Sequence, residues 1–139
     1  MKFPPNIPVY GDTTFRGKCP IESIEQVSVF NRIRQEYPDT WGRLAIHPRN
    51  EQLLSNGQFS TIIKHKAEGM TTGASDLVIP GRRTFVCEIK RRDHTLSAWQ
   101  NGQREYLTAA AVAGAFACVA LGAVGAWDAL EAWLREQNA

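Results

Sequence analysis

The sequence predicts an α/β protein in which a mixed central sheet of about four strands is flanked by helices. Two observations on the 139 residues lead to this fold class. Short apolar runs of strand length alternate along the chain with longer amphipathic segments of helical length. Two of the runs, residues 76–79 and 84–90, are separated only by Pro80-Gly81-Arg82-Arg83, which suits a tight turn between antiparallel strands.

The expected elements follow one another as helix, strand, short helix, hairpin, helix, strand and helix. Helices are expected at residues 20–37, 61–68, 96–113 and 126–137, where apolar residues recur every three or four positions. Pro20 suits the first turn of the first helix, and Pro38 ends that helix. Strands are expected at residues 41–47, 76–79, 84–90 and 115–121, and the last run is apolar throughout, which is typical of a central buried strand.

The first 18 residues differ from the rest in composition. They hold three prolines and two glycines and lack a periodic apolar pattern, so we expect an arm without regular structure. A disordered leader and a segment that adds to a dimer or substrate surface are both open interpretations. Residues 19–139 are expected to form a single domain.

Composition excludes several classes of protein. The 43% apolar and 22% charged residues are ordinary for a soluble domain, and the net charge of +2 is too small for a general basic coat. Three cysteines without metal-type spacing indicate reduced thiols and no zinc site, with Cys87 and Cys118 in core strands. No signal peptide is expected, and glycines interrupt the apolar run 109–126, so no membrane span is predicted.

The hairpin at residues 76–90 carries the residues of chemical interest. Glu88 and Lys90 fall on the strand face opposite to the apolar side chains, and antiparallel pairing brings Asp76 near both. Two carboxylates repel each other unless a cation lies between them, and Mg²⁺ is typically held by one or two carboxylates with water and phosphate oxygens. The pattern favours a metal site beside a lysine that orients water, and a solvated Glu–Lys pair on an edge hairpin is the alternative.

The first helix offers a further carboxylate. Glu22 shares a helix face with Gln26, Val29 and Ile33, so it can turn inward toward the site. Glu25 is the rival candidate, one position around the helix. Both glutamates could also serve only to stabilise the helix N-terminus.

Local clusters of basic and polar residues are the candidates for phosphate contact. His47, Arg49 and Asn50, at and after the end of the expected strand 41–47, could contact phosphate, although Pro48-Arg49-Asn50 could also be only a turn. The other candidates for nucleic-acid binding are Lys64, Lys66, Arg82, Arg83, Arg91, Arg92 and Arg104. Together these cations could form a groove over the active face of the hairpin.

The order of these residues resembles the PD-(D/E)xK nuclease superfamily. Eleven residues separate Asp76 from Glu88 and Lys90 follows, with Glu22 upstream and Gln103 downstream. Within the superfamily the chain is most similar to the VRR-NUC (virus-type replication-repair nuclease) family, at residues 22–26, 47–51, 69–77, 88–91 and 103–107 and at Gly114. It departs from the pattern at Ser75, where the superfamily has proline, and at residues 97–102, which leave Gln100 and Gln103 as alternatives.

The resemblance implies a restriction-endonuclease-like core and a Mg²⁺- or Mn²⁺-dependent DNA endonuclease. Asp76, Glu88 and the Ile89 carbonyl would hold the metal with help from Glu22, Lys90 would position or activate water, and Gln103 would support it. A homodimer is expected, with no organic cofactor. Branched or junction DNA is the implied substrate, in phage replication, recombination or repair in the cytoplasm of a bacterial or phage-infected cell.

Two other classes of function remain as alternatives. One is a non-catalytic nucleic-acid-binding module on the same fold. The presence of acidic residues at all the proposed metal-holding side-chain positions argues against it. The other is a metal-independent interaction domain that docks a partner through the last helix, where Trp127 and Trp133 lie on the apolar stripe. The same tryptophans could instead belong to the core or to a dimer contact.

Overall fold

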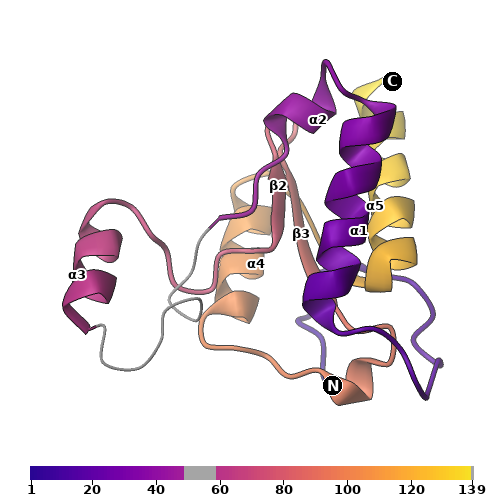
Figure 1. Ribbon diagram of the computed structural model, residues 1–139, viewed down its shortest axis with the longest axis horizontal. Coiled ribbons are helices and arrows are strands. Elements are labelled where there is room, and N and C mark those ends of the chain that lie inside the picture. Colours follow the sequence, from indigo (N-terminus) through magenta and orange to yellow (C-terminus); the bar gives the residue numbers. More distant parts are fainter. Residues whose placement is uncertain (49–58, 139) are drawn as a thin grey trace.

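The computed structural model describes residues 1–48 and 59–138 (Figure 1). Within these residues the chain forms a four-stranded sheet in the order β1-β4-β3-β2, made of Val9–Tyr10, Phe116–Leu121, Phe85–Lys90 and Leu77–Ile79 respectively. β4 is parallel to β1 and to β3, whereas β2 is antiparallel to β3. The predicted fold class, a mixed four-stranded sheet flanked by helices, is confirmed.

The hairpin forms as the alternation of its residues predicts. Leu77 pairs with Cys87 and Ile79 with Phe85, so Asp76 stands immediately before β2 at the open end. Cys87 belongs to the larger hydrophobic core on one face of the sheet, and Val86 to the smaller core on the other. Because side chains alternate along a strand, Glu88 and Lys90 project on the face of Val86.

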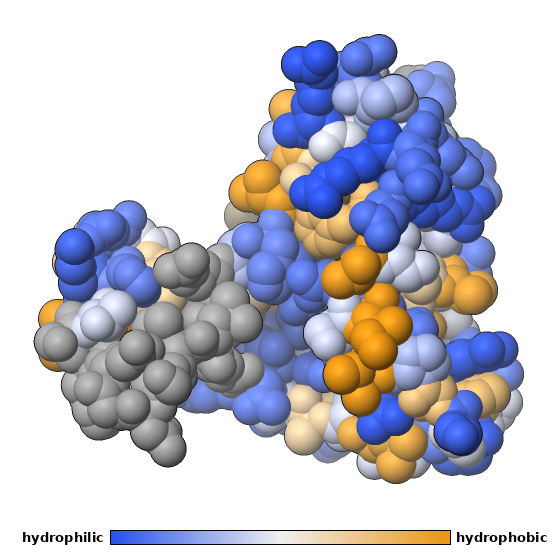
Figure 2. Space-filling model, viewed as in Figure 1, coloured by the Kyte–Doolittle hydropathy of each residue, from blue (hydrophilic) through white to orange (hydrophobic). Residues whose placement is uncertain are grey.

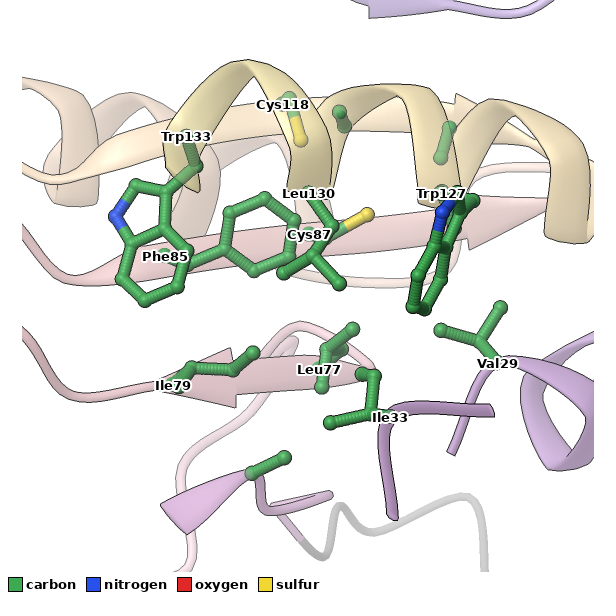
Figure 3. Close-up of a cluster of buried hydrophobic side chains, with 14 of the residues drawn as sticks. Val29, Ile33, Leu77, Ile79, Phe85, Cys87, Cys118, Trp127, Leu130 and Trp133 are labelled. Atoms are coloured by element: carbon green, nitrogen blue, oxygen red, sulfur yellow. The ribbon is translucent and has the colours of Figure 1, made fainter. Parts of the chain in front are cut away.

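Helices cover both faces of the sheet. α1 (Glu22–Glu36) and α5 (Gly122–Gln137) lie side by side on the face of the larger core, and α4 (Gln103–Val112) lies on the other (Figure 1). The buried thiols of Cys87 and Cys118 are free and lie in the larger core, as expected. Trp127 and Trp133 pack in the same core, which answers the question that the sequence left open (Figure 3).

The strand expected at residues 41–47 is wrong for most of its length. Trp41–Leu44 forms the short helix α2, and Ile46 alone pairs with Val78, through two backbone hydrogen bonds of 2.9 Å. The Trp41 ring packs against Trp133 at a centroid distance of 4.9 Å. This tertiary contact, and the Gly42 amide bonded to the Tyr37 carbonyl (2.8 Å), turn the chain into a helical bend that the alternating pattern did not reveal.

The helix expected at residues 96–113 begins seven residues later than predicted, at Gln103. Before it come a 3₁₀ turn, His94–Leu96, and an extended stretch that ends at Gly102, whose φ of 84° is left-handed. The Asp93 side chain accepts the Thr95 amide at the 3₁₀ turn, and the Gly102 conformation interrupts any helix running into α4. We call residues 91–102 the connecting loop.

Two further segments complete the fold. Residues 1–18, expected to lack regular structure, contribute the edge strand β1, whose Val9 pairs with Val119. α3 (Phe59–Ala67) corresponds to the predicted short basic helix and stands apart from the sheet in Figure 1. No helix in the described part of the chain is both long and apolar enough to cross a membrane.

Candidate functional site

A cleft of about 430 Å³ opens at the end of the sheet where the β2–β3 hairpin is open. Four parts of the chain meet there: the start of α1, His47 after α2, the open end of the hairpin, and the start of α4. The residues that line it are Ile21, Glu22, Ser23, Gln26, His47, Asp76, Glu88, Lys90, Gln100 and Gln103. The structure therefore brings together the acidic residues, the lysine and the glutamine that the sequence singled out.

Asp76 and Glu88 place two buried carboxyl groups next to each other. Asp76 Oδ2 accepts a hydrogen bond from the Ile89 amide (2.8 Å). Because the pairing of β2 with β3 stops at Leu77 and Cys87, β2 offers this amide no backbone partner. Glu88 is 1% exposed, and no donor reaches its Oε2. When one of the two carboxyl groups is protonated, it can donate a hydrogen bond to the other.

Burial and mutual repulsion shift the acidities of these groups. Burial, followed by the neighbouring Asp76 carboxylate, raises the pKa of Glu88 well above its usual range. Burial also raises the pKa of Asp76, partly opposed by the hydrogen bond from the Ile89 amide. The raised pKa values mean that the surrounding protein does not fully stabilise the two carboxylates. A cation bound between them would relieve their repulsion.

Lys90 lies beside the two carboxyl groups and is 1% exposed. Its Nζ donates to Gln103 Oε1 (2.8 Å) and to the Ala98 carbonyl (2.9 Å). It also lies 3.7 Å from Oε1 of both Glu88 and Glu22, and 4.8 Å from the centre of the Trp99 ring. Burying an ammonium group is costly unless it is paired, and these partners offset that cost while fixing the position of Nζ.

Gln103 connects the lysine to the glutamate. Its Oε1 accepts from Lys90 Nζ and from the Gln100 amide (2.8 Å), and its Nε2 donates to Glu88 Oε1 (2.8 Å). Two donors on one side and an acceptor on the other fix the orientation of the side-chain amide. Of the two glutamines left open by the sequence, Gln103 reaches both residues, whereas Gln100 lines the cleft and supplies its backbone amide.

The two candidate glutamates of α1 point to different places. Glu22 Oε1 lies 3.7 Å from Lys90 Nζ and accepts from Ser97 Oγ (3.2 Å), and burial raises its pKa. Glu25 Oε2 instead accepts the backbone amide of Ala123, in the first turn of α5. Glu22 therefore belongs to the cleft and Glu25 to the packing of α1 against α5.

The donors fit a hard divalent cation with an incomplete protein shell. Glu88 Oε2 is a buried oxygen without a donor, and Asp76 lies beside it. The Ile89 carbonyl points to the same side as its amide, toward Asp76, because N–H and C=O of one strand residue face the same way. In residues 1–48 and 59–138, no group of three or more His, Cys, Asp or Glu side chains is arranged to hold a metal ion. Two carboxylates with water and phosphate oxygens are nevertheless a typical Mg²⁺ environment.

The predicted cationic groove does not form as one surface. Arg82 and Arg83 lie in the turn before β3, whereas Lys90 is the last residue of β3, a strand about 17 Å long at a rise of about 3.4 Å per residue. Arg83 is engaged there by Glu136 (3.0 Å) and by the Gly114 carbonyl (3.1 Å). The length of β3 therefore separates these two arginines from the open end of the hairpin.

The other predicted cations are dispersed. Arg91 donates to the Cys19 carbonyl (2.8 Å), and the Arg92 guanidinium lies over the Phe15 ring at 4.4 Å. Arg104 is exposed on α4. Lys64 and Lys66 lie on α3, where Lys64 is 3.8 Å from Glu68. Arg49 and Asn50 lie outside the described residues.

The site also includes His47, which the sequence offered only for phosphate contact, and two residues that were not predicted for any role in it. His47 lines the cleft, and its Nδ1 lies 2.7 Å from the Asp76 carbonyl. Ala98 and Trp99 contact Lys90 from the connecting loop. No sequence signal identifies these last two, because residues 96–113 read as one helix and a backbone carbonyl has no side-chain signature.

Comparison with known proteins agrees with this architecture. The solved structure of a protein described as "VRR_NUC domain protein" superposes with a TM-score of 0.65, covering 86% of this chain and 92% of that one at 19% sequence identity. The two chains share a fold. No protein-family model matches the sequence, and no curated protein matches it. At this identity the likeness concerns the fold, and the chemistry is argued from the cleft itself.

Proposed function

We propose that the protein is a divalent-metal-dependent DNA endonuclease that hydrolyses phosphodiester bonds in this cleft. The observation that carries the proposal is the buried cluster of Asp76, Glu88, Lys90 and Gln103, in which Glu88 Oε2 has no donor. A purely structural ion pair would satisfy its buried oxygens within the protein. The fold shared with a VRR_NUC domain protein supports the same reading.

Each residue has a role that its contacts support. Asp76, Glu88 and the Ile89 carbonyl would hold Mg²⁺ or Mn²⁺, with Glu22 at the edge of the cleft. When bound, such an ion polarises a phosphoryl oxygen and neutralises developing charge. Lys90, held 3.7 Å from Glu88 Oε1, orients the attacking water, and Gln103 keeps Lys90 and Glu88 at a fixed separation.

The test is cleavage of linear, supercoiled and four-way-junction DNA with Mg²⁺, Mn²⁺ or EDTA. Glu88→Gln and Lys90→Met should each lower the cleavage rate by about 10²–10⁴-fold, as expected for loss of a metal-holding or water-orienting group. Calorimetric titration with Mn²⁺ gives a reading independent of cleavage, since only Glu88→Gln should weaken the binding of the ion. Glu68→Gln, in the turn directly after α3, is the matched control and should behave as wild type.

One result would contradict the proposal, and a second measurement would then identify the alternative. Pure wild-type protein that cuts none of the three DNAs with any ion would reject catalysis. If that protein and Glu88→Gln then bind DNA equally in EDTA, the chain is a non-catalytic nucleic-acid-binding module. Preference for the four-way junction would support branched DNA as the substrate and a place in phage replication, recombination or repair.

We also propose that the protein works as a homodimer. Exposed apolar side chains gather over the N-terminal half of α1, beside the cleft: Ile21, Ile24 and Val27 are 53%, 57% and 58% exposed (Figure 2). A second copy would cover this stripe. Light scattering after size exclusion should give twice the chain mass for wild type and the single mass for Ile24→Asp. A monomeric wild type at micromolar concentration would reject the dimer.

A further inference from the structure

The N-terminal arm, residues 1–18, and the connecting loop, residues 91–102, are bound to each other although they are distant in sequence. Hydrogen bonds join Trp99 Nε1 to the Lys2 carbonyl (2.7 Å), His94 Nε2 to the Thr13 carbonyl (3.1 Å) and the Gly17 amide to Asp93 Oδ2 (2.9 Å). The Phe3 ring packs edge-on against both His94 (5.2 Å) and Trp99 (6.5 Å). The arm therefore packs along the connecting loop and holds it in place.

The connecting loop also contacts the Lys90 side chain. The Ala98 carbonyl accepts from Lys90 Nζ at 2.9 Å, and the Trp99 ring lies 4.8 Å from Nζ. Ser97 Oγ accepts the Arg91 amide and donates to Glu22 Oε1, which ties the same loop to the edge of the cleft. Two of the closest neighbours of the ammonium group thus come from residues without regular structure.

The Lys90 side chain has four flexible carbons, so contacts on several sides are needed to hold Nζ in one position. Gln103 and Glu88 constrain Nζ from the floor of the cleft, but both lie on the side toward the sheet and α4. The Trp99 ring adds a surface that attracts a cation and excludes water from Nζ. Without the ring, Lys90 can adopt other rotamers that leave Gln103.

We propose that Trp99 is a positioning residue for Lys90 and that the N-terminal arm holds Trp99 in place. The loop gives the ammonium group a cation–π partner and a carbonyl acceptor, and Phe3 fixes the loop. The inference rests on the proposed nuclease function for its kinetic consequence, whereas the positioning itself is a property of the metal-free protein.

The first test needs no metal and no DNA. Proton–nitrogen correlation spectra of the lysine side chains should show a Lys90 ammonium signal that exchanges slowly with water and is displaced by the Trp99 ring current. Trp99→Leu should move this signal toward the position of exposed lysines and speed its exchange, whereas Trp99→Phe should retain the slow exchange. Lys90→Arg assigns the signal by removing it.

The second test measures cleavage. Trp99→Leu should lower kcat about 10-fold or more with KM changed by less than about three-fold, because positioning acts on the reacting geometry rather than on DNA affinity. Trp99→Phe should restore most of kcat. Phe3→Ala should give a smaller loss of kcat. Thr14→Ala, in the same arm, should not change kcat, because the Thr14 hydroxyl bonds to Asp12 rather than to the connecting loop.

The outcomes separate this inference from the proposed function. A wild type that cuts no DNA rejects the nuclease, and the Lys90 signal alone then decides whether Trp99 positions the lysine. A Lys90 signal unchanged in Trp99→Leu overturns the inference whatever the activity. If the wild type is active and Trp99→Leu has the same kcat, the inference is also overturned. Equal kcat values for Phe3→Ala and Thr14→Ala overturn the role of the arm. Circular dichroism verifies that each variant is folded, which is expected because Trp99 is only half-buried.

Discussion

Glu88 and Lys90 are consecutive residues on one strand face, and both are 1% exposed. Charged side chains are rarely buried so completely unless they are paired, and even a paired burial contributes little to stability. Replacing them with apolar residues of similar volume would remove the desolvation cost of both charges. Stability therefore does not explain why both charges are buried here, and their burial supports the proposed nuclease site.

Glu22 and Glu25 allow a matched comparison of function with stability. Glu25→Ala removes the acceptor for the Ala123 amide at the start of α5, so the free energy of unfolding should fall by about 0.5–2 kcal/mol, as for loss of a helix cap. Its cleavage rate should stay at the wild-type level. Glu22→Ala should lower the cleavage rate and change stability less. Urea denaturation and a cleavage assay on both variants decide this, and the reverse pattern would exchange the two assignments.

Gly73 is required where the chain approaches the cleft. Its φ is 78°, and an added Cβ would overlap the carbonyl group of Gly102, at the start of α4. Gly114→Ala is the matched control, since Gly114 also has a positive φ (99°) but open space around it. The control should cost about 1–2 kcal/mol from backbone strain, and Gly73→Ala should cost more. Equal losses in chemical denaturation would show that the crossing of the two backbones is loose.

The connecting loop is the element on which the cleft depends most. It replaces the first two turns of a helix that the sequence predicts, and it bends because side-chain and arm contacts satisfy its backbone groups. Asp93 is central to this, since its carboxylate accepts from the Thr95 hydroxyl (2.5 Å), the Thr95 amide (3.0 Å) and the Gly17 amide (2.9 Å). A helix through the same residues would forgo these bonds.

The Asp93 contacts predict a dependence of stability on pH. The Thr95 hydroxyl, followed by the Gly17 amide, lowers the pKa of Asp93 below its ordinary value of 3.8. A carboxylate with a lowered folded pKa stabilises the protein above the unfolded pKa, and this contribution disappears as pH falls through the folded value. The melting temperature of Asp93→Asn should therefore lie below that of wild type at pH 7, and the gap should narrow below about pH 4. A gap independent of pH would assign the loss to geometry rather than charge.

At the scale of the whole molecule, α5 joins the parts of the fold. Trp133 is fully buried, packs against Trp41 and Phe85 at 4.9 and 5.4 Å, and donates from Nε1 to the Arg83 carbonyl (2.6 Å) (Figure 3). The last helix thus contacts α2, β3 and the hairpin turn at once. The sheet that carries Glu88 and Lys90 is rigid because its other face is closed in this way.

Trp133→Ala should lower the free energy of unfolding by about 3–5 kcal/mol, because it removes a large buried side chain and leaves a cavity. The matched control on the same helix is Val124→Ala, whose side chain is 64% exposed and whose effect should stay within about 0.5 kcal/mol. Equilibrium denaturation by guanidinium chloride measures both. A loss below 1 kcal/mol for Trp133→Ala would mean that α5 is not essential to the core.

The sequence alone determined the sheet's central elements and the strand face that carries the proposed site. Side chains alternate along a strand whatever surrounds it, so the pattern of residues 84–90 was enough to set Glu88 and Lys90 opposite Cys87. The turn at Pro80-Gly81 likewise fixed the pairing that carries Asp76 toward them. These are local rules, and local rules can be read from one stretch of chain.

Only the tertiary structure decided which residues complete the cleft. Glu22 and Glu25 differ by less than one helical turn, and the choice between them follows from where α1 packs against α5. Ala98 and Trp99 reach Lys90 because the arm, some 80 residues or more earlier in the chain, bends the connecting loop away from a helix. Contacts between distant segments override local propensity, so no pattern within either segment could have shown them.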